Sequence, residues 1–437
     1  MSSVTNIVRI PQLRRQLLIT FGLIAVYRLG FHVFIPGVDT AAVKRALESG
    51  QAGGFASVLG FAGAITGGAL TEATLFSLGI MPYISASIIF SLLVKVLPQL
   101  EALSKEGEAG RKLINQYTRY ATIALCVIQS MFVVGYLRSG GGGGGNLILP
   151  QYRDSFFFYL STVVSLTTGS LFLMWLGEMI TEFGVGNGIS LIIMAGIIAR
   201  MPFALGRFVE EEIVRPASES DARLHITLGA GKLLFFLALF VAVIVAVVIT
   251  QQSQRRIPIQ QAKHTRGRRV YGGQRHYLPF RINASGVMPV IFANSLLILP
   301  VAMLQYVGLN IGSSFRAERG FWYISLTIVL IYFFTYFWMS LQFNPIEMAN
   351  NMKEYGSFVP GIRPGRKTAE YLEEIMNRMT LVDASFLVVI TIVGTGILIV
   401  VGVALDIVQK VESHLLMRHY EGFIKRGKIK ARRGGTD

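Results

Sequence analysis

Two pairs of isoleucines mark the stretches of this sequence that most clearly point to a function. Ile84 and Ile88 lie four residues apart in the segment ATLFSLGIMPYISASIIFSLLVKVL, and Ile189 and Ile193 repeat that spacing farther along the chain. Residues four apart share one face of a helix, so each pair predicts an apolar stripe. A collar of branched apolar side chains expels water and blocks ions. Such a collar can also open around a polypeptide of any sequence, because apolar contact needs no specific partner. The pairs therefore favour a pore lining over a plain membrane anchor.

The side chains that could break or make bonds are scattered along the chain. Of the six histidines only His414 and His419 are near neighbours, and we expect no metal site there. The single cysteine, Cys126, lies in an apolar run and is interpreted as a small hydrophobic residue. The cluster Gly184–Gly188 lies between apolar runs that predict helices, whereas a nucleotide-binding loop follows a strand, so we interpret the cluster as a tight turn. No paired carboxylates lie in the middle of a predicted span. The sequence therefore predicts a protein that is not an enzyme and holds no cofactor and no metal.

The composition predicts the elements that must carry these isoleucines. The chain has 437 residues, of which 52% are hydrophobic and 15% are charged, whereas soluble domains carry about 25% charged residues. We therefore predict an all-α polytopic membrane protein, since about 20 apolar residues suffice to cross a bilayer as a helix. Nine apolar runs are long enough: 17–35, 73–97, 117–137, 156–176, 189–205, 228–250, 287–306, 323–343 and 381–405.

The distribution of basic residues predicts the orientation and the number of spans. Alternate loops are basic, which places the N-terminus on the cytoplasmic side. The last run, Met379–Leu405, is about 27 residues long and precedes a basic tail at 409–437. A single crossing would place that tail outside, so we predict two crossings with a short turn between Val393 and Gly394. The expected total is ten spans with both termini cytoplasmic.

Two further features stand out near the first isoleucine pair. Residues 60–72, GFAGAITGGALTE, are small, glycine-rich and too short to cross the bilayer, and they resemble a plug rather than a span. Pro82 lies inside the apolar run 73–97 and predicts a kink or a junction between two helical pieces.

Two cytoplasmic loops carry more positive charge than orientation alone requires. We interpret residues 252–284 as a polar loop, and its excess of arginines suggests an acidic partner such as ribosomal RNA or the acidic face of a motor protein. A loop that only sets topology near anionic lipid remains the alternative. In the loop 345–378, prolines and glycines predict a turn that displays Arg363.

Several segments resemble signatures of the SecY family, the central subunit of the bacterial protein-export channel. They are FSLGIMPYISASIIFSLL, WLGEMITEFGVGNGIS, NASGVMPVIFANSLLILP, GTGILIVVGVALD and the GIRPG motif around Arg363. The resemblance covers nearly the whole chain and implies ten transmembrane helices in two inverted five-helix halves around a central pore. The implied halves are residues 1–220 and 221–437. One departure is Ser91, where the family signature usually has glutamine.

The resemblance also assigns roles to residues of this sequence. It implies a pore ring of six isoleucines, namely Ile84, Ile88, Ile189, Ile193, Ile291 and Ile399. It implies that residues 60–72 close the outer side as a plug whose members include Gly60, Phe61, Ile65, Gly67, Gly68 and Leu70. Helices two and seven would form a lateral gate through which apolar signal sequences pass into lipid.

The function implied is translocation of unfolded preproteins across, and release of signal or transmembrane segments into, the bacterial cytoplasmic membrane. The implied partners are the small subunits SecE and SecG, the SecA motor, the ribosome, signal sequences and anionic lipids. The residues expected to meet the motor or the ribosome are Arg255, Arg256, Arg266, Arg268, Arg269 and Arg363.

The main alternative is a secondary transporter of a small solute. That class predicts interrupted helices with polar or charged residues at membrane depth, whereas the candidate midplane positions here hold isoleucines. A lipid-interacting scaffold without a conduit is a weaker alternative, because it gives the plug-like segment and the basic loops no purpose.

Overall fold

The computed structural model describes residues 11–43, 73–138, 147–152, 155–209, 222–261, 264–266, 269–271, 275–293, 296 and 321–426. The described helices are α2 (Pro11–Gly30), α5 (Met81–Val96), α6 (Pro98–Lys105), α7 (Glu108–Arg138), α8 (Phe156–Phe183), α9 (Gly188–Val209), α10 (Ala222–Gln252), α13 (Phe321–Gln342), α14 (Pro345–Glu354) and α15 (Arg366–Arg426), with a 3-10 turn, η2, at Pro150–Tyr152. The strands are β1 (Gln254–Gln261), β2 (His264–Arg266), β3 (Arg269–Tyr271), β4 (Arg275–Arg281) and β5 (Ser357–Phe358).

The mostly helical membrane fold is confirmed. Within the described ranges five helical stretches are long and apolar enough to cross a membrane: Glu108–Gly135, Phe156–Phe183, Leu233–Gln252, Ile324–Glu354 and Arg366–Ile392. A bent pair, Met81–Val96 with Pro98–Lys105, could add a sixth. The count of ten spans stays a prediction, because most of the run 287–306 lies outside the described residues.

The predicted kink at Pro82 is wrong. The helix α5 begins at Met81, so Pro82 lies in its first turn, where the missing N–H costs no helical hydrogen bond. The preceding residues 73–80 form turns that are tied to the end of the first span, with Leu75 N donating to Val33 O at 2.8 Å. The sharp bend lies instead at Leu97, where the axes of α5 and α6 differ by 98°. Leu97 is extended because it precedes Pro98.

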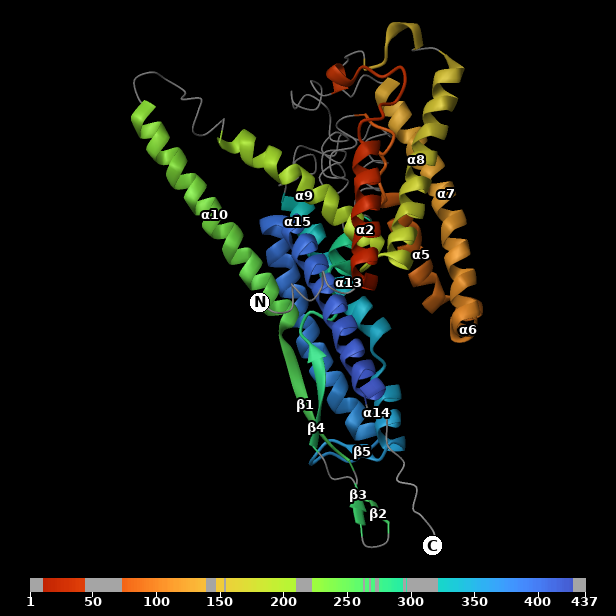
Figure 1. Cartoon of the computed structure of the whole chain (residues 1–437), viewed down its shortest axis with the longest axis vertical. Coiled ribbons are helices and arrows are strands. Elements are labelled where there is room, and N and C mark those ends of the chain that lie inside the picture. Colours follow the sequence, from red (N-terminus) through yellow and green to blue (C-terminus); the bar gives the residue numbers. More distant parts are fainter. Residues whose placement is uncertain are drawn as a thin grey trace.

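A large apolar core joins elements from both parts of the chain. It contains residues of α2, α5, α8, α9, α10, the helical residues 288–293, α13 and α15. In Figure 1, α2, α5, α7 and α8 lie beside one another, and α13, α14 and α15 form a second group. Helix α9 extends outward from the first group, and the long helix α10 runs back toward the second group. The core thus lies where the two groups meet.

Helix α15 reverses direction within its length. On one side Asp383 accepts a hydrogen bond from Ser285, and on the other an added Cβ at Gly402 would lie 3.2 Å from Cγ2 of Val287. A straight helix would separate Asp383 from Gly402 by about 28 Å, but Ser285 and Val287 span at most about 7 Å. The two arms of α15 therefore run side by side, as Figure 1 also shows, in agreement with the predicted hairpin.

Residues 252–284 were interpreted from the sequence as a polar loop, but most of the described residues in this range form β-strands. Its strands β1 and β4 pair antiparallel, with Gln254 opposite Arg281, and β5 joins the other edge of β1. Strands β2 and β3 pair separately and form the tip of this arm, which projects from the helices (Figure 1). Ile257 and Phe280 are buried against the start of α15. This packing explains why a basic, proline-containing segment becomes a sheet.

Candidate functional site: an apolar cluster and a basic surface

The six predicted ring isoleucines lie in one apolar cluster. Ile84 and Ile88 come from α5, Ile193 from α9 and Ile399 from the second arm of α15, and their exposed fractions are between 3% and 9%. The other two, Ile189 and Ile291, are partly buried and pack against the same cluster. Four separate segments therefore converge, which is the arrangement that an apolar collar requires.

The turn between α8 and α9 fixes the second isoleucine pair. Gly177 lets Ile189 come close, since an added Cβ at Gly177 would lie 3.0 Å from Cγ1 of Ile189. At Gly188 an added Cβ would lie only 2.0 Å from the carbonyl oxygen of Gly177. The turn is completed by Asn187, whose side chain accepts a hydrogen bond from Ser190 N. The glycines thus serve close helix packing, in agreement with the tight turn predicted from the sequence.

The segments bearing Ile291 and Ile399 are held against each other by neighbouring contacts. Val287, four residues before Ile291, lies beside Gly402, three residues after Ile399. Gln251 at the end of α10 approaches the same glycine, with Nε2 at 3.0 Å from the position of an added Cβ. A methyl group at position 402 would therefore require Val287 and Gln251 to shift by a few tenths of an ångström.

The predicted plug, residues 60–72, lies outside the part of the chain that the structure describes. Gly60, Phe61, Ile65, Gly67, Gly68 and Leu70 all lie outside the described residues. The description resumes at Ala73, whose carbonyl accepts a hydrogen bond from Ile35 N at 3.0 Å. Thr74 forms an isolated bridge with Phe34 and is fully buried. Residues 73–75, which follow the predicted plug in the sequence, are therefore bound to the end of the first predicted span.

The predicted partner-binding arginines lie on two neighbouring structures. Arg255 and Arg256 are exposed on β1, and β2 and β3 carry Arg266 and Arg269 at the tip of the arm. Arg268 lies outside the described residues. Arg363 lies in the turn that follows β5, and β5 pairs with β1, so the arm and this turn belong to one structural unit.

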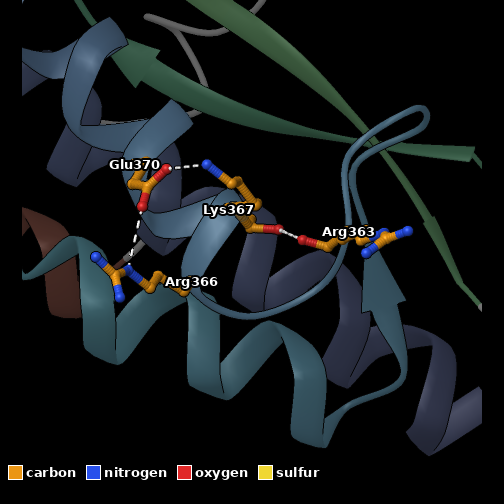
Figure 2. A network of polar contacts seen from close by, with 5 residues as sticks. Arg363, Arg366, Lys367 and Glu370 are labelled. Carbon is orange, nitrogen blue, oxygen red and sulfur yellow. Dashed lines mark hydrogen bonds and ion pairs between the residues drawn. The ribbon is translucent and has the colours of Figure 1, made fainter.

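Figure 2 shows how the Arg363 turn is built. Thr368 donates its hydroxyl to the carbonyl oxygen of Arg363 at 2.9 Å, and Thr368 itself is buried. Glu370 binds the two other basic side chains, with Lys367 Nζ at 2.8 Å and Arg366 Nε at 3.2 Å. The guanidinium of Arg363 points away from this carboxylate (Figure 2). The turn therefore presents the Arg363 cation outward, while Glu370 pairs with the two neighbouring cations.

Asp383 and Thr368 are among the buried polar residues, and neither was predicted to be functional. Asp383 is fully buried, and Ser285 donates to its Oδ2 at 2.5 Å. A carboxylate inside an apolar run was the available signal for Asp383, whereas nothing in the sequence marks Ser285 as its partner. Among the described residues no group of three or more His, Cys, Asp or Glu side chains could hold a metal ion.

Comparison with known proteins identifies the family. A sequence model of the SecY family matches residues 74–408. The protein translocase subunit SecY of Streptomyces scabiei is 41% identical over 444 residues, covering 95% of this chain and 98% of that protein. Two solved structures share the fold, each covering 95% of both chains. One is of SecY, described as having a plug domain that stabilises the closed state of the translocation channel and maintains a membrane seal (TM-score 0.58, 19% identity). The other is Sec61 in the canine ribosome-channel complex from the endoplasmic reticulum (TM-score 0.56, 16% identity). The chain therefore belongs to the SecY family.

Proposed function

We propose that the chain is the protein-conducting channel subunit of a bacterial translocase. It moves unfolded preproteins across the cytoplasmic membrane and releases signal or transmembrane segments sideways into lipid. The observation that carries this proposal is the convergence of the six isoleucines from four separate segments into one apolar cluster. The name of the Streptomyces scabiei relative supports the same function.

The proposed mechanism separates sealing from passage. In the resting channel the ring of isoleucines excludes water and so blocks ions, while residues 60–72 close the outer side. A translocating polypeptide pushes the ring of isoleucines apart. The apolar side chains then pack around the polypeptide and continue to exclude water and ions. The lateral gate would open between α5 and the helix that begins at residues 288–293.

The two halves, residues 1–220 and 221–437, would clasp the pore. The chain would cross the membrane ten times with both termini in the cytoplasm. The basic loops, which follow the positive-inside rule, support this orientation. The β arm and the Arg363 turn would then lie on the cytosolic side.

The proposed partners follow from the chemistry of that side. The chain is proposed to be a channel and not an enzyme, so the energy for movement must come from a bound motor, SecA, or from a translating ribosome. Arginines on β1 and in the Arg363 turn offer positive charge to ribosomal RNA or to acidic protein. SecE and SecG would complete the membrane complex, and anionic lipids would bind near the basic loops.

Ion conductance in planar bilayers tests the proposal directly. We expect the intact protein to be nearly silent, deletion of residues 60–72 to produce a leak, and Ile84→Asn or Ile291→Asn to raise the leak as well. Silence of all three variants, with folding and insertion shown, would overturn the channel assignment. Saturable uptake of a small solute by the silent protein would favour a secondary transporter instead.

A further inference from the structure

A buried carboxylate–hydroxyl pair joins two segments that each carry a predicted ring isoleucine. Asp383 on the first arm of α15 is fully buried, and Ser285, in the turn after β4, is 2% exposed. The Ser285 hydroxyl donates to Asp383 Oδ2 at 2.5 Å, a distance typical of a hydroxyl that binds a carboxylate. Burying an ionisable side chain away from solvent is costly, and its presence here calls for a functional reason.

The hydroxyl of Ser285 binds this carboxyl group, and the backbone N–H of Ser285 also faces it. The second oxygen, Oδ1, has no hydrogen-bond partner among the described residues. Two basic side chains on neighbouring described elements are engaged elsewhere: Arg378 pairs with Glu374, and Arg281 donates to Gln409. From α13, Tyr332 reaches Ser385 and not the carboxyl group. Loss of the Ser285 hydroxyl would therefore leave Asp383 buried without that hydrogen bond.

The turn that contains Ser285 leads directly to a ring residue. Asn283 accepts a hydrogen bond from Gly286 N at 2.7 Å, and Gly286 has a φ of +65°, which glycine adopts without strain. Residues 288–293 are helical and include Ile291. Ile291 N donates to Val287 O at 3.3 Å. Little free chain therefore separates the Ser285 contact from Ile291.

The other partner belongs to the hairpin that carries Ile399. Asp383 and Ile399 lie on the two arms of α15, and Val287 packs beside Gly402 on the second arm. The Ser285–Asp383 contact thus joins the beginning of the Ile291 segment to the element that presents Ile399. We propose that this contact is a positioning pair that keeps Ile291 in the closed collar. The proposal rests on the channel function proposed above.

Conductance of the purified full-length protein in planar bilayers tests the pair. We expect Ser285→Ala to raise the leak roughly tenfold, the scale on which removing the partner of a buried carboxylate shifts a closed–open balance. Ser285→Thr retains the hydroxyl and should restore the wild-type leak. Ser385→Ala is the matched control, because it removes a 2.8 Å contact between α13 and the same arm of α15 without touching the turn. This control should stay silent.

A second variant keeps the test open if Ser285→Ala does not fold. The double change Ser285→Ala with Asp383→Leu removes the buried charge together with its partner, so it should fold, yet it should still leak because the tie is gone. A leak from Ser385→Ala equal to that of Ser285→Ala would overturn the proposal, as would failure of Ser285→Thr to restore the seal.

The proposal and the channel function fail in different ways. If Ile84→Asn leaks while the folded Ser285 variants do not, the positioning role is wrong and the channel stands. If Ile84→Asn is also silent, the channel itself fails, and the positioning role fails with it.

Discussion

Arg119 on α7 and Glu178 on α8 form a two-pronged ion pair. Arg119 Nε lies 2.9 Å from Glu178 Oε1, and Nη2 lies 2.8 Å from Oε2. This parallel geometry suits the planar guanidinium and is stronger than a single contact. The pair joins the third and fourth predicted spans, and its side chains are 49% and 31% exposed, so solvent screening reduces its contribution.

We expect Arg119→Ala to lower the free energy of unfolding by about 0.5–1 kcal/mol. Lys105→Ala is the matched control, because it breaks a contact of the same length, 2.8 Å, to Glu101 within one helix, where both side chains are more exposed. That change should have a smaller effect on the unfolding temperature. Thermal unfolding in detergent measures both. Equal decreases in the unfolding temperature of the two variants would show that the two-pronged geometry of the Arg119–Glu178 pair adds no stability.

The turn between α8 and α9 should tolerate no side chain at Gly188. An added methyl would lie 2.0 Å from the carbonyl oxygen of Gly177, so backbone must move, and we expect Gly188→Ala to destabilise the protein by about 1–3 kcal/mol. Gly22→Ala on α2 is the control, since an added Cβ there meets nothing within 4 Å. Alanine at position 22 should be neutral or stabilise the helix by up to about 1 kcal/mol. Thermal unfolding of the two variants would show no difference if the close approach at Gly188 were unimportant.

The membrane-spanning part of the fold was largely predictable from sequence. Apolar runs of sufficient length are local signals, and they located the apolar parts of α7, α8, α10 and α13. The isoleucine pairs carried a similar local signal in their i, i+4 spacing, although the family resemblance was needed to select Ile291 and Ile399 from many apolar residues.

The remaining features depend on contacts between distant residues. Pro82 was expected to kink a helix, but the helix starts beside it because the preceding residues bind to the end of the first span. The β arm was missed because each long strand contains a proline, Pro258 or Pro279, which argues against a strand locally. Burial of Ile257 against α15 outweighs that preference. The pairing of Ser285 with Asp383, 98 residues apart, likewise has no local signal.

The turn at Arg363 should need Thr368 to hold its shape. We expect Arg363→Ala to weaken binding of the SecA motor or the ribosome about tenfold, the scale on which a binding arginine contributes. Thr368→Val keeps the size of the side chain but removes the hydrogen bond to the Arg363 carbonyl, so it should weaken binding by a smaller factor. Thr368→Ser should restore it. Dissociation constants from a binding titration give the comparison.

Arg366→Ala is the charge control for that turn. Arg366 is exposed, but it already pairs with Glu370 at 3.2 Å, so its removal should change binding little. If Arg366→Ala were as harmful as Arg363→Ala and Thr368→Val had no effect, net charge and not the shape of the turn would explain binding.

The β arm should give binding a salt dependence that reports its arginines. If Arg255 and Arg256 contact ribosomal RNA, changing both to alanine should reduce the slope of log affinity against log salt by roughly 0.7–0.9 for each phosphate that is no longer neutralised. The strand pairing should survive, because both side chains are exposed while the neighbouring Ile257 is buried. Binding of ribosomes across a series of salt concentrations measures the slope. An unchanged slope for ribosomes, together with weaker binding to vesicles of anionic lipid, would assign these arginines to the membrane surface instead.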